Sequence, residues 1–323
     1  MFTNKDIEYR TIYMINCIKD RELRVSNGEL LLEELEEKKT LTKLPFQKIL
    51  ALFIIGHIHI TTPLIEKCKK WNVAIVVMKP SLRPVFFWSN SAEANYLLRR
   101  RQYQLPQEDI TIAKWIVYNK VCNQLTLLHN SRKGDELTAE AKGICHKAIC
   151  NWLGRVTEYN KLMGLEGYVS KAFFAAYFQD FNWNGRKPRA KCDIINATLD
   201  IGYTILFNYI ECFVRMFGFD VYVGVYHRLW FKRKSLICDL VEPFRCIIDR
   251  TVRTAFNRKQ FSAKDFQLYK GEYRLKIEKN TDYCKVFFDA LIPYKMEVFK
   301  FVRSYYRCFM QGRNISAYPK FEI

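Results

Sequence analysis

The sequence predicts an α+β protein, with a β-rich region at residues 1–90 and a larger helical region at residues 91–323. Three observations support this. Short runs of β-branched and aromatic residues bounded by turn signals fill the first region, and the hydrophobic period becomes helical after it. The length of 323 residues suits two domains. The change of pattern places the boundary at Ser89-Asn90-Ser91.

The β-rich region contains one hairpin signal and one clear helix. Asn27-Gly28 separates two short apolar runs and predicts a hairpin turn. Pro63, preceded by threonines, predicts the first turn of a helix that ends at Trp71. Strands are expected at residues 11–15, 49–60, 73–78 and 85–88. His57 and His59 fall on one face of the second of these strands, where a polar strand face explains them better than a metal site, since no third ligand is in view.

From Ala92 onward the pattern is helical. One apolar stripe follows the helical period through Ala113, Val117, Val121, Leu125 and Leu128. Further helices are expected at residues 137–163, 165–178, 193–217 and 282–310, with a small hairpin at residues 266–277.

The charge predicts a polyanionic partner. Lysine and arginine number 52 against 33 acidic residues, which gives a net charge of +19 and a pI near 9.4. The backbone of a nucleic acid is the simplest such partner. An anionic membrane surface is the alternative, but no basic amphipathic helix is added to a terminus, and we expect no membrane association.

Cysteine usage predicts a reducing, cytoplasmic location. The eleven cysteines form no C-x-x-C pair and stand mostly in apolar stretches, which is typical of buried thiols. Cys145-His146 with Cys150 is better explained by helix packing than by zinc. No signal peptide is expected in the charged stretch at residues 1–10, and no membrane span at residues 49–65, which contain two histidines and a proline.

Three segments of the helical region carry candidate catalytic groups. Glu166 follows Gly164-Leu165; alone, it is explained as a carboxylate at a helix start. His227 ends an apolar run, where a structural histidine is the plainer interpretation. Asp239 and Glu242 are spaced to share a helix face, although Pro243 limits regular helix there. Two such carboxylates indicate either a solvated acidic face or a divalent metal or basic partner.

Taken in this order, the segments resemble the signature blocks of the CRISPR-associated spacer-acquisition integrases (the Cas-one family). The first block is Glu166-Gly167 leading to Tyr177-Phe178, and the middle block contains Asn196 and Gly202-Tyr203. The last blocks are a Gly-x-x-His turn ending at His227 and a Ser-Leu-x-x-Asp-Leu-x-Glu-x-Phe-Arg segment. Arg186-Lys187-Pro188 matches between the first two blocks, so the resemblance covers nearly the whole chain.

The resemblance implies a metal-dependent enzyme that joins DNA by transesterification, with a 3′-hydroxyl as nucleophile. Glu166, His227 and Glu242 match the metal ligands, and Asp239 matches an acidic position that supports them. The oxygen-rich set suits Mg²⁺, and the histidine makes Mn²⁺ equally acceptable. Lys234 stands where the family often has proline, and Glu242 where some members have aspartate. The family fold implies a β-sandwich-like N-terminal domain for dimerisation, followed by an all-α catalytic and DNA-binding domain.

The expected partners are double-stranded DNA (a spacer precursor and a CRISPR repeat) and further copies of the chain in a homodimer or higher oligomer. Whether a second adaptation subunit (the Cas-two family) is required is left open. The candidate DNA contacts, each of which has a solvated helix face as its alternative, are Arg99, Arg100, Arg101, Arg186, Lys187, Arg189, Arg233, Lys234 and Arg245. Two other functions remain: a nuclease for branched DNA that uses water with the same ligands, and a non-catalytic DNA-binding subunit.

Overall fold

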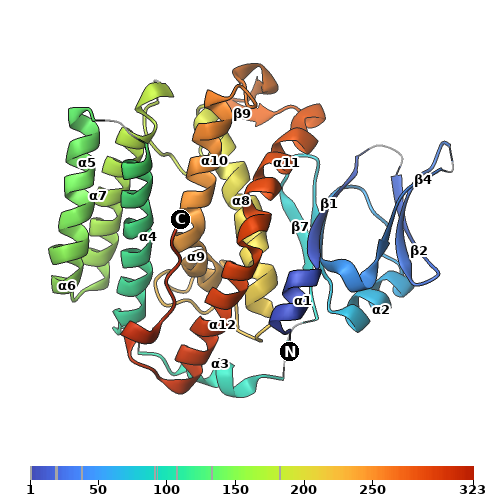
Figure 1. Cartoon of the computed structure of the whole chain (residues 1–323), viewed down its shortest axis with the longest axis horizontal. Coiled ribbons are helices and arrows are strands. Elements are labelled where there is room, and N and C mark those ends of the chain that lie inside the picture. The colour runs from blue at the N-terminus through green and yellow to red at the C-terminus, as the bar shows by residue number, and fades with distance from the viewer. Residues whose placement is uncertain are drawn as a thin grey trace.

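The computed structural model describes residues 2–18, 21–37, 39–90, 92, 94–106, 108–131, 134–181 and 183–323. Figure 1 shows the strands of the N-terminal region on one side of the molecule and the long helices on the other. The predicted α+β order, with strands first and helices after them, is confirmed. Ser91, the last residue of the predicted boundary, lies outside the described residues.

The N-terminal region contains a four-stranded mixed sheet. Its order is β1-β5-β6-β7, in which β1, β5 and β6 run parallel and β7 is antiparallel to β6. Every residue of β5 is buried, and the ring of Phe53 packs edge-on against Phe288 of the helical region at 4.9 Å. One face of this sheet therefore joins the core of the helical region. The strands are β1 (Thr11–Cys17), β5 (Ile49–Gly56), β6 (Ala74–Met78) and β7 (Pro84–Trp88).

A second, antiparallel sheet consists of β2 (Arg21–Ser26), β3 (Glu29–Glu34) and β4 (Lys39–Pro45). Asn27 and Gly28 have φ of 49° and 79°, so the predicted hairpin turn is confirmed. Both sheets and helix α2 (Thr62–Trp71) enclose a second core. The sandwich-like arrangement stays a prediction, because the helix shares that core with the two sheets.

Two strand predictions need correction. The predicted strand at residues 49–60 ends at Gly56, so His57 and His59 follow the strand rather than lie on its face. Gly56 has φ of 116°, and a Cβ there would lie 2.4 Å from the carbonyl oxygen of Cys17, so the backbone turns away at a position only glycine fits. Strand β4 was not predicted, since its residues are mostly exposed and polar and show no buried face.

The helical region is built around the buried helix α8 (Ile194–Arg215), against which α10, α11 and α12 pack. In Figure 1, α4, α5 and α7 form a second group beside it. Among the described residues, no helix is long and apolar enough to cross a membrane. The other helices are α1 (Asn4–Tyr9), α3 (Tyr96–Tyr103), α4 (Thr111–Asn130), α5 (Glu136–Lys147), α6 (Leu153–Arg155), α7 (Tyr159–Tyr177), α9 (Ser235–Val241), α10 (Arg245–Asn257), α11 (Asn280–Leu291) and α12 (Lys295–Gln311).

The predicted break between residues 163 and 165 is wrong. Helix α7 runs continuously through Gly164 and Gly167, so Glu166 lies inside a helix rather than at its start. A glycine in a helix costs only about 1 kcal/mol, which packing against α4 and α5 outweighs. The helix predicted at residues 282–310 is in fact α11 and α12, separated by a short 3-10 turn at Ile292–Tyr294. The hairpin predicted at residues 266–277 is confirmed as β8 (Phe266–Tyr269) and β9 (Glu272–Leu275).

Candidate active site

Two buried glutamates share one lysine. Glu166 comes from α7, Lys120 from α4, and Glu242 from the 3-10 turn Glu242–Phe244 between α9 and α10. The Lys120 ammonium contacts Glu166 Oε1 and lies 2.7 Å from Glu242 Oε2. The side chains of Lys120, Glu166 and Glu242 are 11%, 19% and 4% exposed, respectively. The fold therefore brings two carboxylates that are distant in sequence around a single positive charge.

Local contacts fix both carboxylates. Ser170, one helical turn after Glu166, donates its hydroxyl to Glu166 Oε1 at 2.7 Å. Arg245 lies 3.0 Å from Glu242 Oε1. Asn123 on α4 donates to the carbonyl of Pro243 at 2.9 Å and so anchors the turn that carries Glu242. Pro243, which limits regular helix, instead suits the first positions of this 3-10 turn.

Both glutamates are ionised at neutral pH. Burial by itself raises the pKa of Glu242, but Arg245 and Lys120 outweigh burial and hold this pKa at about 2. Burial likewise raises the pKa of Glu166, and the Lys120 charge brings it below its ordinary value. Burial lowers the pKa of Lys120, whereas the two glutamates raise it, and the net direction is upward. The cluster is therefore a charged one that needs a cation between its carboxylates.

A third carboxylate, Asp239, holds the candidate histidine. Its Oδ1 accepts hydrogen bonds from the backbone N–H of His227 at 2.8 Å and from the ring Nδ1 of His227 at 2.7 Å. Its Oδ2 accepts from the backbone N–H groups of Val225 and Tyr226 at 2.6 and 3.0 Å. Because the acceptor is a carboxylate, Nδ1 carries the ring proton, and Nε2 keeps its lone pair for a ligand.

Gly224 explains the Gly-x-x-His spacing. A Cβ at this position would lie 2.5 Å from Asp239 Oδ2 and 2.8 Å from the backbone carbon of Ser235. The backbone of residues 224–227 wraps closely around the Asp239 carboxylate, and a side chain at the first position would force it open. The glycine is therefore required by the approach of the loop to α9.

Glu166, His227 and Glu242 line one pocket of about 550 Å³, so the three predicted ligands come together. Asp239 lies behind His227 with no exposed surface and supports the ring. Among the described residues, no group of three histidine, cysteine, aspartate or glutamate side chains is arranged so that it could hold a metal ion as it stands. The Lys120 ammonium lies between the two carboxylates instead. Glu242 Oε2 is buried and makes an ion pair with Lys120 but no hydrogen bond. Two carboxylates and an imidazole, from Glu166, Glu242 and His227, are a donor set that fits a divalent cation.

Two arginines and a tyrosine complete the pocket wall. The guanidinium groups of Arg186 and Arg245 lie 5.3 and 4.7 Å from the ring centroid of Tyr203. The Tyr203 hydroxyl donates to Asp249 Oδ1, and burial raises the pKa of Asp249 to about 7. Lys120, Ser170 and Asp249 were not predicted as site residues, since none belongs to a recognisable spacing.

The predicted DNA contacts lie on several separate parts of the structure. Arg186 and Arg245 line the pocket, whereas Arg189 and Arg233 line a separate hollow. Lys187 is exposed, and the Lys234 ammonium lies 2.7 Å from buried Glu211. On α3, at the bottom of Figure 1, Arg99 and Arg101 donate to the carbonyls of Gly218 and Met310, respectively, and both Arg100 and Arg101 are exposed. None of the three α3 arginines lines the pocket.

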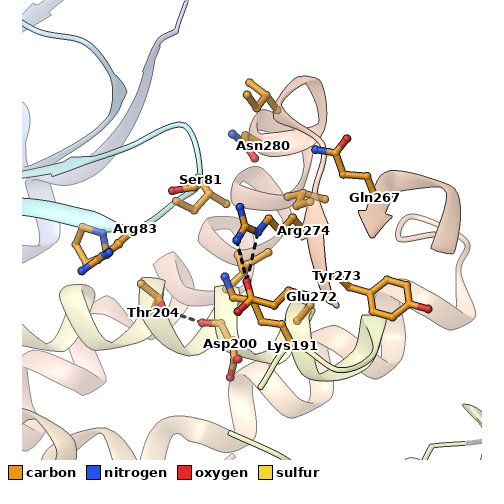
Figure 2. Close-up of a pocket in the computed structure, with 16 residues that line it drawn as sticks. Ser81, Arg83, Lys191, Asp200, Thr204, Gln267, Glu272, Tyr273, Arg274 and Asn280 are labelled. Carbon is orange, nitrogen blue, oxygen red and sulfur yellow. Dashed lines mark hydrogen bonds and ion pairs between the residues drawn. The ribbon is translucent and has the colours of Figure 1, made fainter. Parts of the chain in front are cut away.

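A second cavity, of about 570 Å³, lies between the loop joining β6 to β7, helix α8 and the β8–β9 hairpin. Figure 2 shows residues that line it from these elements, among them Arg83, Asp200 and Arg274, with Arg274 paired to Glu272. None of the predicted metal ligands lines this cavity.

Solved structures define the class of fold. The chain is similar to a CAS1 protein from Thermotoga maritima, with a TM-score of 0.79 at 16% identity over 96% of this chain and 100% of that one. A casposase bound to an integration product has a TM-score of 0.77 at 18% identity, over 96% of this chain and 94% of the casposase chain. A Cas6-RT-Cas1–Cas2 complex also gives 0.77 at 18%, covering 97% of this chain and 36% of that one. At these identities the likeness shows a Cas1-type fold.

Sequence comparison gives the family. A CRISPR-associated endonuclease Cas1 of Thermodesulfovibrio yellowstonii is 29% identical over 258 residues, which cover 77% of this chain and 80% of that protein. The family model of the CRISPR associated protein Cas1 matches residues 17–288, and the chain belongs to this family. The resemblance seen in the sequence blocks is confirmed.

Proposed function

We propose that this chain is a CRISPR adaptation integrase, which joins the 3′-hydroxyl end of a short DNA fragment to a CRISPR repeat by metal-dependent transesterification. The observation that carries the proposal is the convergence of Glu166, His227 and Glu242 on one pocket, with both carboxylates arranged around a cation. Membership of the Cas1 family and the likeness to a casposase with its integration product support it.

The side chains suggest a division of roles. The carboxylates of Glu166 and Glu242 and Nε2 of His227 would hold one Mg²⁺ or Mn²⁺. Such an ion, when bound, polarises a phosphodiester and stabilises the charge that develops during in-line displacement. Asp239 keeps the imidazole in the tautomer that leaves Nε2 free. Arg186 and Arg245, which line the pocket, would bind phosphate oxygens.

The reaction needs no high-energy cofactor. A new bond forms between the incoming 3′-oxygen and the phosphorus at the repeat edge, and the bond from that phosphorus to its own 3′-oxygen breaks. One 3′-hydroxyl is consumed and another is released, and the proton passes from the first oxygen to the second. The second candidate is a nuclease, in which water replaces the 3′-hydroxyl. The relative from Thermodesulfovibrio yellowstonii is named an endonuclease, which favours this candidate.

The proposed partners follow from the same family. Double-stranded DNA would bind the basic surface of a chain with a net charge of +19. The likeness to a Cas6-RT-Cas1–Cas2 complex supports a Cas2 partner. We further propose that the β-rich region joins two copies of the chain.

The test is a gel assay of strand joining beside a DNA-binding titration, both with Mn²⁺. We expect His227→Ala to lose joining and to keep binding, because binding is spread over many phosphate contacts whereas chemistry depends on one site. His129→Ala, at the exposed end of α4, is the matched control and should keep both. Joining by His227→Ala at the parent rate would contradict the proposal. A fragment with a 3′-deoxy end separates the candidates: repeat cleavage that proceeds normally with it favours the nuclease.

A further inference from the structure

Three residues on one face of α8 hold Arg186, which lines the candidate active-site pocket. Asn196, Asp200 and Tyr203 are spaced by four and three positions, so they share a face of the helix. The Nη1 group of Arg186 donates to Asn196 Oδ1 at 2.9 Å, and its Nη2 group donates to Asp200 Oδ1 at 2.6 Å. The ring centroid of Tyr203 lies 5.3 Å from the same guanidinium group. The Arg186 side chain is only 12% exposed, so α8 fixes its position through three side chains.

The same two polar side chains also hold the backbone of the loop that carries Arg186. Asn196 Oδ1 accepts a second hydrogen bond from the backbone N–H of Lys187 at 2.8 Å, and Asn196 Nδ2 donates to the carbonyl of Gly185 at 3.0 Å. Asp200 Oδ1 accepts from the backbone N–H of Arg189 at 3.3 Å. The loop is therefore attached to α8 by its backbone on both sides of Arg186.

The loop does not fix its own shape. Gly185, Arg189 and Lys191 have φ of 91°, 63° and 45°, and such left-handed backbone is unfavourable for the two residues that carry a Cβ. The described residues of this segment, 183–193, make a single backbone–backbone hydrogen bond among themselves, at 3.3 Å. Contacts from outside the loop must therefore hold it, and the fully buried Asn196 makes three of them.

Arg186 keeps donors free for a ligand. One N–H of each terminal nitrogen is bound to Asn196 or Asp200, and the remaining N–H groups of the guanidinium make no hydrogen bond with the described residues. The same pocket contains Glu166 and His227. A guanidinium group whose plane is already fixed binds phosphate oxygens without first having to be ordered.

We propose that Asn196 and Asp200 are positioning residues of the candidate active site: they fix the loop so that Arg186 binds an oxygen of the reacting phosphate. The inference rests on the proposed function and adds to it two residues that do not touch DNA. Neither side chain lines the pocket, and Asn196 has no exposed surface. Both residues therefore act through Arg186, and removing either anchor should have the same kind of effect as removing the arginine.

The experiment is a double-mutant cycle of Asn196→Ala and Arg186→Ala in the full-length chain, measured as the rate of strand joining at saturating DNA with Mn²⁺. We expect Arg186→Ala to lower this rate about 10- to 100-fold, as the loss of one charge-assisted hydrogen bond gives. Asn196→Ala alone should lower the rate at least about fivefold, and less than about twofold further when residue 186 is already alanine. A residue that acts only through another gives this non-additive pattern, whereas general destabilisation gives additive losses.

The same cycle is also read in binding titrations in EDTA, which need no reaction. Each phosphate contact contributes about 0.9 to the slope of log affinity against log salt concentration. Arg186→Ala and Asn196→Ala should each flatten this slope by about 0.9, and the double variant should flatten it no further. A chain that binds DNA with this pattern but joins none would refute the proposed integrase and leave the positioning role standing.

Two further variants make the result specific. Asn208→Ala is the matched control, because Asn208 is a buried asparagine of the same helix that donates to the carbonyl of Thr204 rather than to the loop. It should keep the parent's joining rate and salt slope. In Asp200→Asn the amide oxygen keeps both hydrogen bonds of Oδ1, and the NH₂ group replaces Oδ2, which makes none. Its joining rate should exceed that of Asp200→Ala at least about fivefold.

The proposal would be overturned by Asn196→Ala with the joining rate and salt slope of the parent. Equal losses from Asn196→Ala with and without Arg186 would also overturn it, since the asparagine would then act through the fold. So would equal joining rates of Asp200→Asn and Asp200→Ala. If Asn196→Ala does not unfold cooperatively, Asp200→Ala takes its place in the same cycle with Arg186→Ala, and additive losses there overturn the proposal.

Discussion

The Asp239 carboxylate is the feature of this site whose role can be tested most sharply. In Asp239→Asn one carboxylate oxygen becomes an amide NH₂ group with almost no change of shape. Each oxygen of Asp239 accepts two hydrogen bonds, from Val225 and Tyr226 on one side and from the backbone and ring of His227 on the other. Whichever way the amide turns, its NH₂ group faces two donors: both bonds are lost if it faces Val225 and Tyr226, and the bond from the His227 backbone is lost if it faces the ring.

The magnitude follows from these contacts. Hydrogen bonds to charged groups contribute about 1.5–3 kcal/mol each, so the loss of one or two of them should cost the variant about 1.5–6 kcal/mol of stability. If the NH₂ group faces the ring, Nδ1 must accept, and the proton moves to Nε2, where it blocks a metal. If it faces the loop, the ring loses its anionic partner. Either outcome should weaken the apparent affinity for Mn²⁺ by about 10- to 100-fold.

The assay is strand joining as a function of Mn²⁺ concentration, with thermal unfolding followed in parallel. Asp220→Asn is the matched control, because Asp220 lies in the same segment and bonds Tyr103 and Tyr222 outside the pocket. We expect the control to keep the parent's Mn²⁺ dependence. A half-saturating Mn²⁺ concentration in Asp239→Asn equal to that of the parent would refute the reasoning, since the ring would then be positioned by something other than Asp239.

Three other predictions follow. Lys120→Met leaves Glu166 and Glu242 without their shared cation and should lower the free energy of unfolding by about 3–5 kcal/mol. Mn²⁺ should then raise the unfolding temperature more in the variant than in the parent, and equal rises would contradict a metal site there. The folded pKa of Asp249, about 7, lies above its ordinary value of 3.8, so stability should fall as pH rises through this window. Asp249→Asn should lack that fall in urea titrations at several pH values, and identical slopes would contradict it. Replacing Arg99, Arg100 and Arg101 by alanine should flatten the salt dependence of DNA binding, mostly through Arg100 and Arg101, the two exposed ones; an unchanged slope would remove α3 from the DNA path.

Local patterns in the sequence determined the features that depend on neighbouring residues. Asn27-Gly28 requires positive φ at both positions, so its turn could be predicted without any tertiary contact. Pro63 and Asn72 bound α2 for similarly local reasons. Strand β4 and the unbroken α7 could not be predicted, because pairing with β3 in one case and packing on α4 and α5 in the other outweigh a weak local preference.

For the candidate site, the sequence determined the residue types, and the tertiary structure determined that these residues lie close together. Glu166, His227 and Glu242 were singled out through resemblance to a family, while each alone had a plainer structural explanation. Only the packing of α4 against α7 and the Glu242 turn placed Lys120 between the two glutamates. Only the loop at Gly224 wrapped three backbone N–H groups around Asp239. Burial of like charges is costly unless a cation lies between them, and where that cation stands is decided by elements far apart in the chain.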